Sequence, residues 1–457
     1  QYYRPAIEFI NGEYWGITNV QERLDKYYLK YHYNVDENNV AIIEGPYART
    51  ADLVEGDETD CSNYISMRDY AEENDISLAA NYQHLQSLMD VDSYIDYNVL
   101  RIYSGDVDSV TKHMYAWREK IENVTDGRWQ WQTKDFDGSM AAYDVNRDLL
   151  AASLDPNLSD ATILLRKLMT NDDFKNQFIN RFADHLNTTF VPSRMETIIN
   201  QMSSAVSSEI VKHISRWGYP ASLNNWTYTV NSYKTWSEQR PDIVREQIVN
   251  QFGLAGTYAL TLHTDASNGA IKVNSMEIKQ DTPGVIDPNN WSGVYFKGVP
   301  IQLQAIPQSG YQFAGWTGID SMVDDTTKTN VTLTPDSDII VSASFIKESQ
   351  DNCFIATAAF GSKFAPAVSL LRKFRDDFLM NSDWGRRFVN FYYKNSPPIA
   401  RFIAQKDILR MMVRILLIPL IVFVYLLYRP FYAITILLMI LFLYMVQNKY
   451  RVRRTSN

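Results

Sequence analysis

The chain has 457 residues, of which 46% are apolar, so it is long enough for about three domains with apolar cores. Residues 363–457 contain 16 Lys and Arg but four Asp and Glu, a net of +12, so with a total of −9 the rest of the chain carries −21. This acidic body with a basic, apolar tail argues against nucleic acid as the main partner and favours anionic lipid headgroups. The two cysteines, Cys61 and Cys353, are far apart and predict neither a disulfide framework nor a metal site.

Residues 1–60 are predicted to form mainly strands. The segments 6–10 (AIEFI) and 14–20 (YWGITNV) read as strands, and Asn11-Gly12 between them is a favoured two-residue hairpin turn. A helix is predicted for 21–29. Because the first residues already have a strand pattern, we expect the domain to begin upstream of Gln1.

The middle of the chain is predicted to be mainly helical, and a β module follows it. A helical pattern covers 77–102, with Leu85, Leu88, Met89, Val99 and Leu100 at buried positions, and a strand pair follows at 114–117 and 128–133. Helices are predicted at 163–169, 174–186, 195–217 and 233–252. Beyond about residue 256, partly alternating segments at 259–264, 301–306 and 339–345, separated by Gly, Asn, Pro and Asp, predict a small all-β module.

The C-terminal end has the composition of a membrane segment. Arg429 is the only charged residue in 415–446, and one spanning helix needs about 20 apolar residues. Because Pro430 breaks the helical pattern, the segment is either a hairpin of two short helices or one kinked, tilted helix. Basic residues at both ends favour the hairpin with cytoplasmic ends. They are Lys406, Arg410, Arg414, Lys449, Arg451, Arg453 and Arg454.

Four ordered segments resemble one known family. Residues 9–29 (FINGEYWGITNVQERLDKYYL) are similar to a pattern of roughly F-x-N-G-x-Y-x-G-x-Y-x-L-x-E-x-I-D. This pattern marks the spore-coat-protein-H (CotH) kinase-like family. Residues 92–97 (DSYIDY) precede a catalytic-loop-like SGDVD at 104–108, and WQWQTKDFDG at 129–138 is similar to the family's strand that ends in D-x-D. Arg216-Trp217 and Arg240-Pro241 follow the family's closing pattern.

The resemblance implies an atypical protein-kinase fold that uses ATP and Mg²⁺. Asp108 would take the place of the catalytic-loop aspartate. Asp135 would hold the metal, and Asp137 is a second ligand candidate, because Mg²⁺ prefers such oxygen ligands. Glu22 would lie where the linker between the lobes meets the adenine.

One departure from the family pattern leaves catalysis open. Aligned on Asp108, the family's paired loop asparagines are replaced by Lys112 and His113, which are poor substitutes for an oxygen ligand of a second metal. The alternative to an active kinase is therefore a catalytically dead kinase-fold scaffold or adhesion protein of the bacterial surface.

The two later parts resemble other bacterial modules. Residues 298–316 (GVPIQLQAIPQSGYQFAGW) and 341–345 are similar to small β repeats of bacterial surface proteins. Tyr311, Phe313 and Trp316 most simply form the core of this module, and an exposed aromatic face that binds cell-wall polysaccharide is the alternative. Residues 353–362 (CFIATAAFGS) resemble the start of a short C-terminal domain known as the CFI box.

We therefore predict a multidomain protein of the cell membrane whose bulk is extracytoplasmic. It has an α+β atypical protein-kinase-like domain (1–254, N-terminal part missing), a surface β-repeat module (257–346), an α-helical CFI-box segment (350–410) and a transmembrane helix or hairpin (411–447). The expected partners are membrane lipids and a protein substrate on the cell or spore surface. A body outside the membrane favours the single kinked span over the hairpin.

Overall fold

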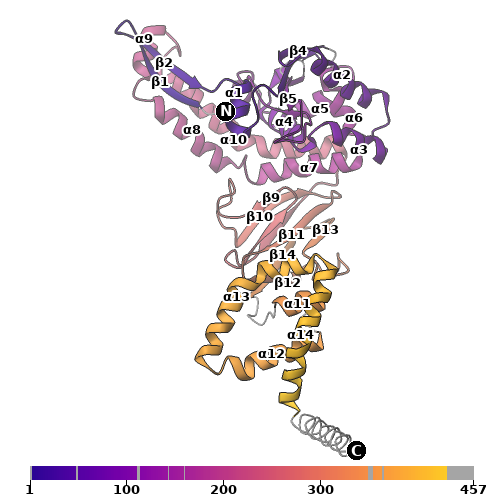
Figure 1. Ribbon diagram of the computed structural model, residues 1–457. Coiled ribbons are helices and arrows are strands. Elements are labelled where there is room, and N and C mark those ends of the chain that lie inside the picture. The colour runs from indigo at the N-terminus through magenta and orange to yellow at the C-terminus, as the bar shows by residue number, and fades with distance from the viewer. Residues whose placement is uncertain are drawn as a thin grey trace, which may run out of the picture. The chain divides into compact units, whose positions relative to one another are not determined.

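The computed structural model describes residues 3–47, 50–110, 114–142, 144–158, 160–347, 354–362 and 365–429. It divides into two compact units, Gln1–Ile346 and Lys347–Asn457. Figure 1 shows the helices and strands of both. In chain order, the elements up to Phe252 are β1 (Tyr3–Ile10), β2 (Glu13–Gln21), α1 (Lys26–Tyr33), β3 (Val40–Tyr47), β4 (Thr50–Glu55), α2 (Glu58–Glu73), α3 (Ala79–Leu88), α4 (Val91–Ser104), η1 (Val107–Val110), β5 (Met114–Glu119), β6 (Gln130–Trp131), η2 (Met140–Ala142), α5 (Leu149–Leu154), η3 (Asp160–Thr162), α6 (Ile163–Leu168), α7 (Asp172–Asn187), α8 (Pro192–Val206), α9 (Ile210–Trp217) and α10 (Leu223–Phe252).

The predicted N-terminal hairpin is confirmed as the antiparallel pair β1 and β2. Asn11 and Gly12 have φ angles of 52° and 83°, the positive values that a two-residue hairpin turn with this dipeptide requires. The helix predicted at 21–29 is wrong at its start. Strand β2 continues to Gln21, and α1 begins at Lys26 because the Asp25 carboxylate caps it, accepting the backbone N–H of Tyr27 at 3.0 Å.

The central sheet has the strand order β4-β3-β5-β6, and helices pack against it around a common apolar core. The helix predicted at 77–102 is two helices, α3 and α4. They separate at Met89, which bridges to Trp129, and the N–H of Asp90 donates to the Trp129 carbonyl at 2.8 Å. Helix α2 was not predicted. Its start has a sequence signal, because the Asp57 carboxylate accepts the Thr59 N–H at 2.9 Å and the Asp57 N–H donates to Asp60.

The helices predicted between 160 and 252 are confirmed, with changed boundaries. The segment predicted at 195–217 divides into α8 and α9, and α10 starts at Leu223 instead of residue 233. Ser222 sets this start, since its hydroxyl accepts the N–H of Asn225.

The β module is confirmed as two four-stranded sheets, β10-β7-β14-β12 and β13-β11-β8-β9. Trp316 is 2% exposed, and Phe313 packs beside it with ring centroids 5.1 Å apart, as expected for core residues, while Tyr311 is half-buried. The apolar core of this module is continuous with that of the kinase-like part. Its strands are β7 (Thr257–His263), β8 (Gly269–Val273), β9 (Met276–Ile278), β10 (Asn290–Phe296), β11 (Ile301–Pro307), β12 (Tyr311–Thr317), β13 (Asn330–Leu333) and β14 (Ile339–Lys347).

Helix α7 joins the kinase-like part to the β module through a buried carboxylate. Asp184 is 1% exposed and accepts hydrogen bonds from the Ser275 hydroxyl at 2.6 Å, the Ser275 N–H at 3.1 Å and the Tyr295 hydroxyl at 3.0 Å. One turn further on, Asn187 pairs with both backbone groups of Val294, at 2.8 and 2.9 Å. These buried polar contacts define one relative position of the two parts.

We expect Asp184→Asn to change how stability depends on pH. Burial raises the pKa of Asp184, so the folded protein binds this proton more readily than the unfolded chain does. Stability from this group therefore falls as pH rises from the unfolded pKa of about 4 through the folded pKa, and the variant loses that slope. At neutral pH, replacing one acceptor oxygen by a donor costs about 1–3 kcal/mol.

Denaturant titrations over a pH series measure this effect. The control is Asp173→Asn on the exposed side of the same helix, which should change neither the slope nor the midpoint appreciably. If the free energy of unfolding of Asp184→Asn depended on pH as it does in the unchanged protein, the prediction would be contradicted.

The second unit is helical. Its described elements are α11 (Phe354–Phe360), α12 (Pro366–Phe374), the π-helical turn η4 (Arg375–Leu379), α13 (Asp383–Ala404) and α14 (Asp407–Tyr428). Among the described residues, α14 is the one helix long and apolar enough to cross a membrane, and very little of it is buried. Cys353 and the segment from Pro430 onward, including the predicted break and second basic flank, lie outside the described residues. The choice between hairpin and kinked span therefore stays a prediction.

Candidate functional site

The loop after α4 separates two neighbouring aspartates by burial. Gly105 ends the helix with a φ of 71°, and the chain then enters η1. Asp106 is fully buried and forms an ion pair with Arg101, which is 1% exposed. Asp108 is half-buried, and its N–H donates to Asp106 Oδ1 at 3.3 Å. Asp106 therefore stabilises the loop, and Asp108 is the carboxylate that can reach a ligand.

The second loop carries the D-x-D sequence after β6. Asp135 and Asp137 are both exposed, and Asp135 has a φ of 62°, a left-handed conformation that Asp tolerates better than most residues. Arg101 Nη2 donates to the Lys134 carbonyl at 2.6 Å, and the guanidinium lies 5.0 Å from the Phe136 ring. Arg101 thus contacts both loops.

The two loops also contact each other directly. The Val107 N–H donates to the Gly138 carbonyl at 3.2 Å. A Cβ atom added at Gly138 would lie 3.3 Å from Val107 Cγ2 and 3.8 Å from Asp108 Oδ2, so glycine allows the close approach. The structure therefore brings Asp108 next to the loop that carries Asp135 and Asp137.

The structure places Glu22 in a different set of contacts. Its carboxylate lies 2.8 Å from His32 Nε2 on α1, so one of its oxygens is used there. The same segment reaches β5, because the Tyr115 hydroxyl donates to the Leu24 carbonyl. The Lys134 ammonium lies 5.5 Å from the Tyr115 ring and pairs with both Glu44 oxygens, at 2.8 and 2.9 Å. Glu22 thus lies on a segment that contacts β5, and its adenine role stays a prediction.

Comparison with known families agrees with this geometry. A family model described as CotH kinase protein matches residues 1–244, more than half of the chain. The chain belongs to the CotH kinase protein family. A second model, described as divergent InlB B-repeat domain, matches residues 274–349 and agrees with the predicted surface β repeat. No curated protein matches the chain.

The residues of the CotH kinase site suit magnesium by ligand type. Asp108, Asp135 and Asp137 offer the carboxylate oxygens that Mg²⁺ prefers, on two loops in contact. In the described part of the chain, no group of three or more His, Cys, Asp and Glu side chains is arranged to hold a metal ion. Magnesium in kinases is bound by one or two carboxylates together with substrate phosphates, so this arrangement fits a site that the nucleotide completes. Lys112 and His113 lie outside the described residues.

Arg240 supports the CotH kinase loop from behind. It is fully buried on α10 and donates to four backbone carbonyls, those of Ile102 at 2.9 Å, Tyr103 at 2.8 Å, Val145 at 2.6 Å and Arg147 at 3.0 Å. Two of these carbonyls are in the last turn of α4, from which the Asp108 loop starts. Burial lowers the pKa of Arg240 to about 10, so the guanidinium stays charged at neutral pH.

Sequence reasoning missed the supporting roles of Arg101, Asp106 and Lys134. Arg101 could have been found as a charged residue between the apolar positions Val99 and Ile102 of α4, where solvation is poor. The sequence assigned Arg240 to the family's closing pattern but gave it no structural role. The sequence signal for Arg240 was similar, because the apolar residues Trp236 and Val244 lie one helical turn before and after it, on the same side of α10.

Proposed function

We propose that this CotH kinase protein is a membrane-anchored, extracytoplasmic enzyme that transfers phosphate from ATP, with Mg²⁺, to hydroxyl groups of a surface or spore-coat protein. The observation that carries the proposal is the Val107–Gly138 hydrogen bond, which holds the Asp108 loop against the D-x-D loop. Phosphoryl transfer depends mainly on positioning and on charge stabilisation, and paired carboxylate loops supply both.

Each site residue has a separate role in this proposal. Asp108 accepts the proton of the acceptor hydroxyl, because it is the accessible carboxylate of its loop. Asp135 holds the metal, Asp137 is a second ligand, and Glu22 lies toward the adenine. Bound Mg·ATP would supply the phosphoryl group and neutralise charge on its oxygens. Arg101 and Asp106 position the two loops.

The other parts of the chain support the proposed location. Helix α14 has the length and composition of a spanning helix, and the basic residues at its start suit anionic headgroups. The B-repeat match is of a kind that suits a bacterial surface protein. Together they support an anchor at the C-terminal end with the kinase body outside.

We expect Asp135→Asn to remove the Mg²⁺-dependent activity, by roughly 100-fold or more, without unfolding the protein. Asparagine tolerates the left-handed backbone at this position but lacks the charge. Autophosphorylation with labelled ATP, with and without Mg²⁺, measures the loss, and thermal unfolding checks the fold. Asp320→Asn, which changes an exposed aspartate of the β module, is the control and should keep full activity. Equal signals in Asp135→Asn and the unchanged protein would remove Asp135 from the mechanism.

The alternative is a kinase-fold scaffold or adhesion protein without catalysis. Lys112 and His113 at the loop positions of the family's asparagines favour it. Titration of the protein with Mg·ATP separates the two proposals, since a scaffold of this kind would show neither nucleotide-dependent stabilisation nor phosphate transfer. The β module would then be the binding surface, with cell-wall polysaccharide as one ligand to test.

A further inference from the structure

Helix α13 carries apolar residues on two separate sides. One side packs into the second unit and includes Val389, Ala400 and Ile403, each less than 8% exposed. The other side faces outward, and its residues follow one another at intervals of four, three, eight and three residues, which places them along one line of the helix. Its members are Trp384, Phe388, Phe391, Ile399 and Phe402, whose exposed fractions run from 46% to 71%.

This exposed apolar line is large and mostly aromatic. Trp384 is 71% exposed and Phe391 is 67% exposed, and the rings of Trp384 and Phe388 stack with centroids 5.7 Å apart. An aromatic stripe of this length facing water is unfavourable unless something covers it. Because these residues lie along one side of the helix, α13 could lie flat on a planar surface with this side in contact.

The sequence of the same helix contains regularly spaced basic residues. Arg387, Lys394 and Arg401 recur in the sequence of α13 at intervals of seven residues, about two helical turns. An exposed apolar line on a helix whose sequence also carries regularly spaced basic residues is the pattern of a helix that lies in the plane of an anionic membrane surface, with its aromatic side inserted.

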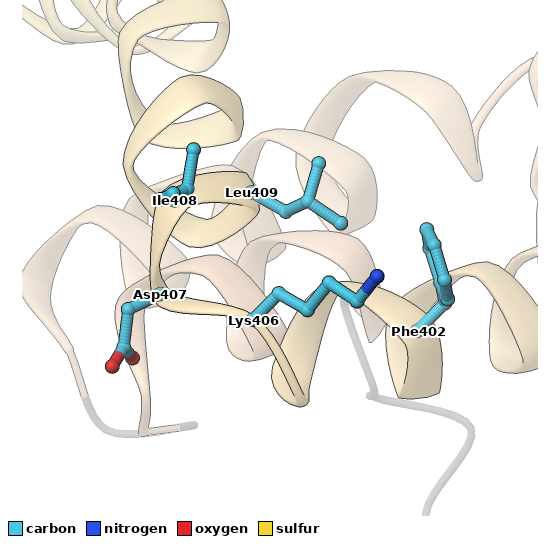
Figure 2. Close-up of a pocket in the computed structure, with 5 residues that line it drawn as sticks. All are labelled: Phe402, Lys406, Asp407, Ile408 and Leu409. Atoms are coloured by element: carbon cyan, nitrogen blue, oxygen red, sulfur yellow. The ribbon is translucent and has the colours of Figure 1, made fainter.

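The exposed line continues into the spanning helix. α13 ends at Ala404 and α14 begins at Asp407, where a groove is lined by Phe402, Lys406, Asp407, Ile408 and Leu409. Figure 2 shows Lys406 and Leu409 directed toward the side of Phe402, whereas Asp407 points away. The Lys406 ammonium lies 5.0 Å from the Phe402 ring. A basic side chain next to an aromatic ring at the start of an apolar helix suits the membrane–water interface.

We propose that α13 is an interfacial helix, with its Trp384–Phe402 line buried in the headgroup region of an anionic bilayer beside the spanning helix α14. The protein would then contact the membrane along a whole helix and not at one crossing point. This inference rests on the anchoring part of the proposed function and goes beyond it, because it assigns a second membrane-binding element.

Spin labels at three positions of the full-length chain test the proposal. In a background with Cys61→Ser and Cys353→Ser, single cysteines replace Phe388 on the exposed apolar line, Arg386 on an exposed polar side of the same helix, and Leu416 on α14. The protein is reconstituted in phosphatidylcholine vesicles with or without phosphatidylglycerol. Relaxation by oxygen, which concentrates in lipid, is compared with relaxation by a water-soluble nickel chelate.

The proposal expects the Phe388 label to be relaxed more by oxygen and the Arg386 label more by nickel, with the Phe388 label deeper when phosphatidylglycerol is present. Replacing Arg387, Lys394 and Arg401 by Glu should abolish that extra depth. Nickel-accessible labels at both 388 and 386, with 416 in lipid, would overturn the inference while leaving the anchor intact. Nickel access at 416 as well would overturn the anchor too. Spin–spin broadening at 388 that disappears on mixing with unlabelled protein would assign the face to a second copy and would also overturn it.

Discussion

Arg101→Met should destabilise the kinase domain by roughly 3–5 kcal/mol, because it leaves the buried Asp106 carboxylate without its charge partner. The variant also loses the hydrogen bond from Arg101 to the Lys134 carbonyl, so the D-x-D loop loses one of its contacts with α4. Urea unfolding followed by Trp fluorescence measures the change, since several tryptophans of this domain are buried.

Two further variants make this test specific. Combining Arg101→Met with Asp106→Leu removes both charges, so the double variant should be more stable than either single variant. Lys175→Met, which removes a partly exposed lysine paired with the exposed Asp172 at 2.6 Å, should cost no more than about 1 kcal/mol. Additive losses in the double variant would show that the pair does not stabilise the loop as a unit.

The second large effect is expected for Arg240→Met. Four backbone carbonyls lose a charged donor, although the Ile102 carbonyl keeps the N–H of Gly105 and the Arg147 carbonyl keeps the side-chain amide of Gln247. A hydrogen bond from a charged group contributes about 1.5–3 kcal/mol before the structure relaxes, so we expect a net loss of roughly 3–5 kcal/mol. Because two of these carbonyls end α4, the Asp108 loop should also become less ordered. Nucleotide-dependent stabilisation should therefore fall together with the free energy of unfolding.

Arg240→Lys and Lys234→Met are the matched comparisons. Lysine keeps the charge at position 240 but has one donor group in place of the planar guanidinium, so it should recover part of the stability at most. Lys234 lies on the same helix and is partly exposed, 3.9 Å from Glu196, and its replacement should have a small effect. If Arg240→Met unfolded at the same urea concentration as the unchanged protein, the four hydrogen bonds would have no net value.

Several features followed from local sequence because their physical cause is local. The Asn11-Gly12 turn needs only two residues that accept positive φ, and the alternation in the β module needs only one buried side per strand. The helix boundaries were predicted less well. N-caps such as Asp25 and Ser222 set the start of a helix, whereas the apolar pattern alone places that start several residues away. The break at Met89 depends on Trp129, which lies 40 residues later, and so could not be found locally.

The candidate site also combines features that the local sequence indicates with features that depend on distant parts of the chain. The order SGDVD and then WQWQTKDFDG indicated which loops to examine, but the sequence does not distinguish Asp106 from Asp108. Burial decided between them, because Arg101 lies inside the fold and pairs with Asp106. Glu22 was assigned from its place in a motif, whereas its contact with His32 depends on how α1 folds back.

By itself, the sequence determined the family, the order of the domains, the aspartates that could carry chemistry and the apolar C-terminal helix, since each depends on short motifs or on composition. The tertiary structure decided which aspartates are accessible, how Arg240 supports the loop, how Asp184 joins the β module to α7 and which side of α13 is exposed. The physical reason is that burial and hydrogen-bond partners come from segments far apart in the chain, as with Asp184 and Ser275, and no local pattern records them.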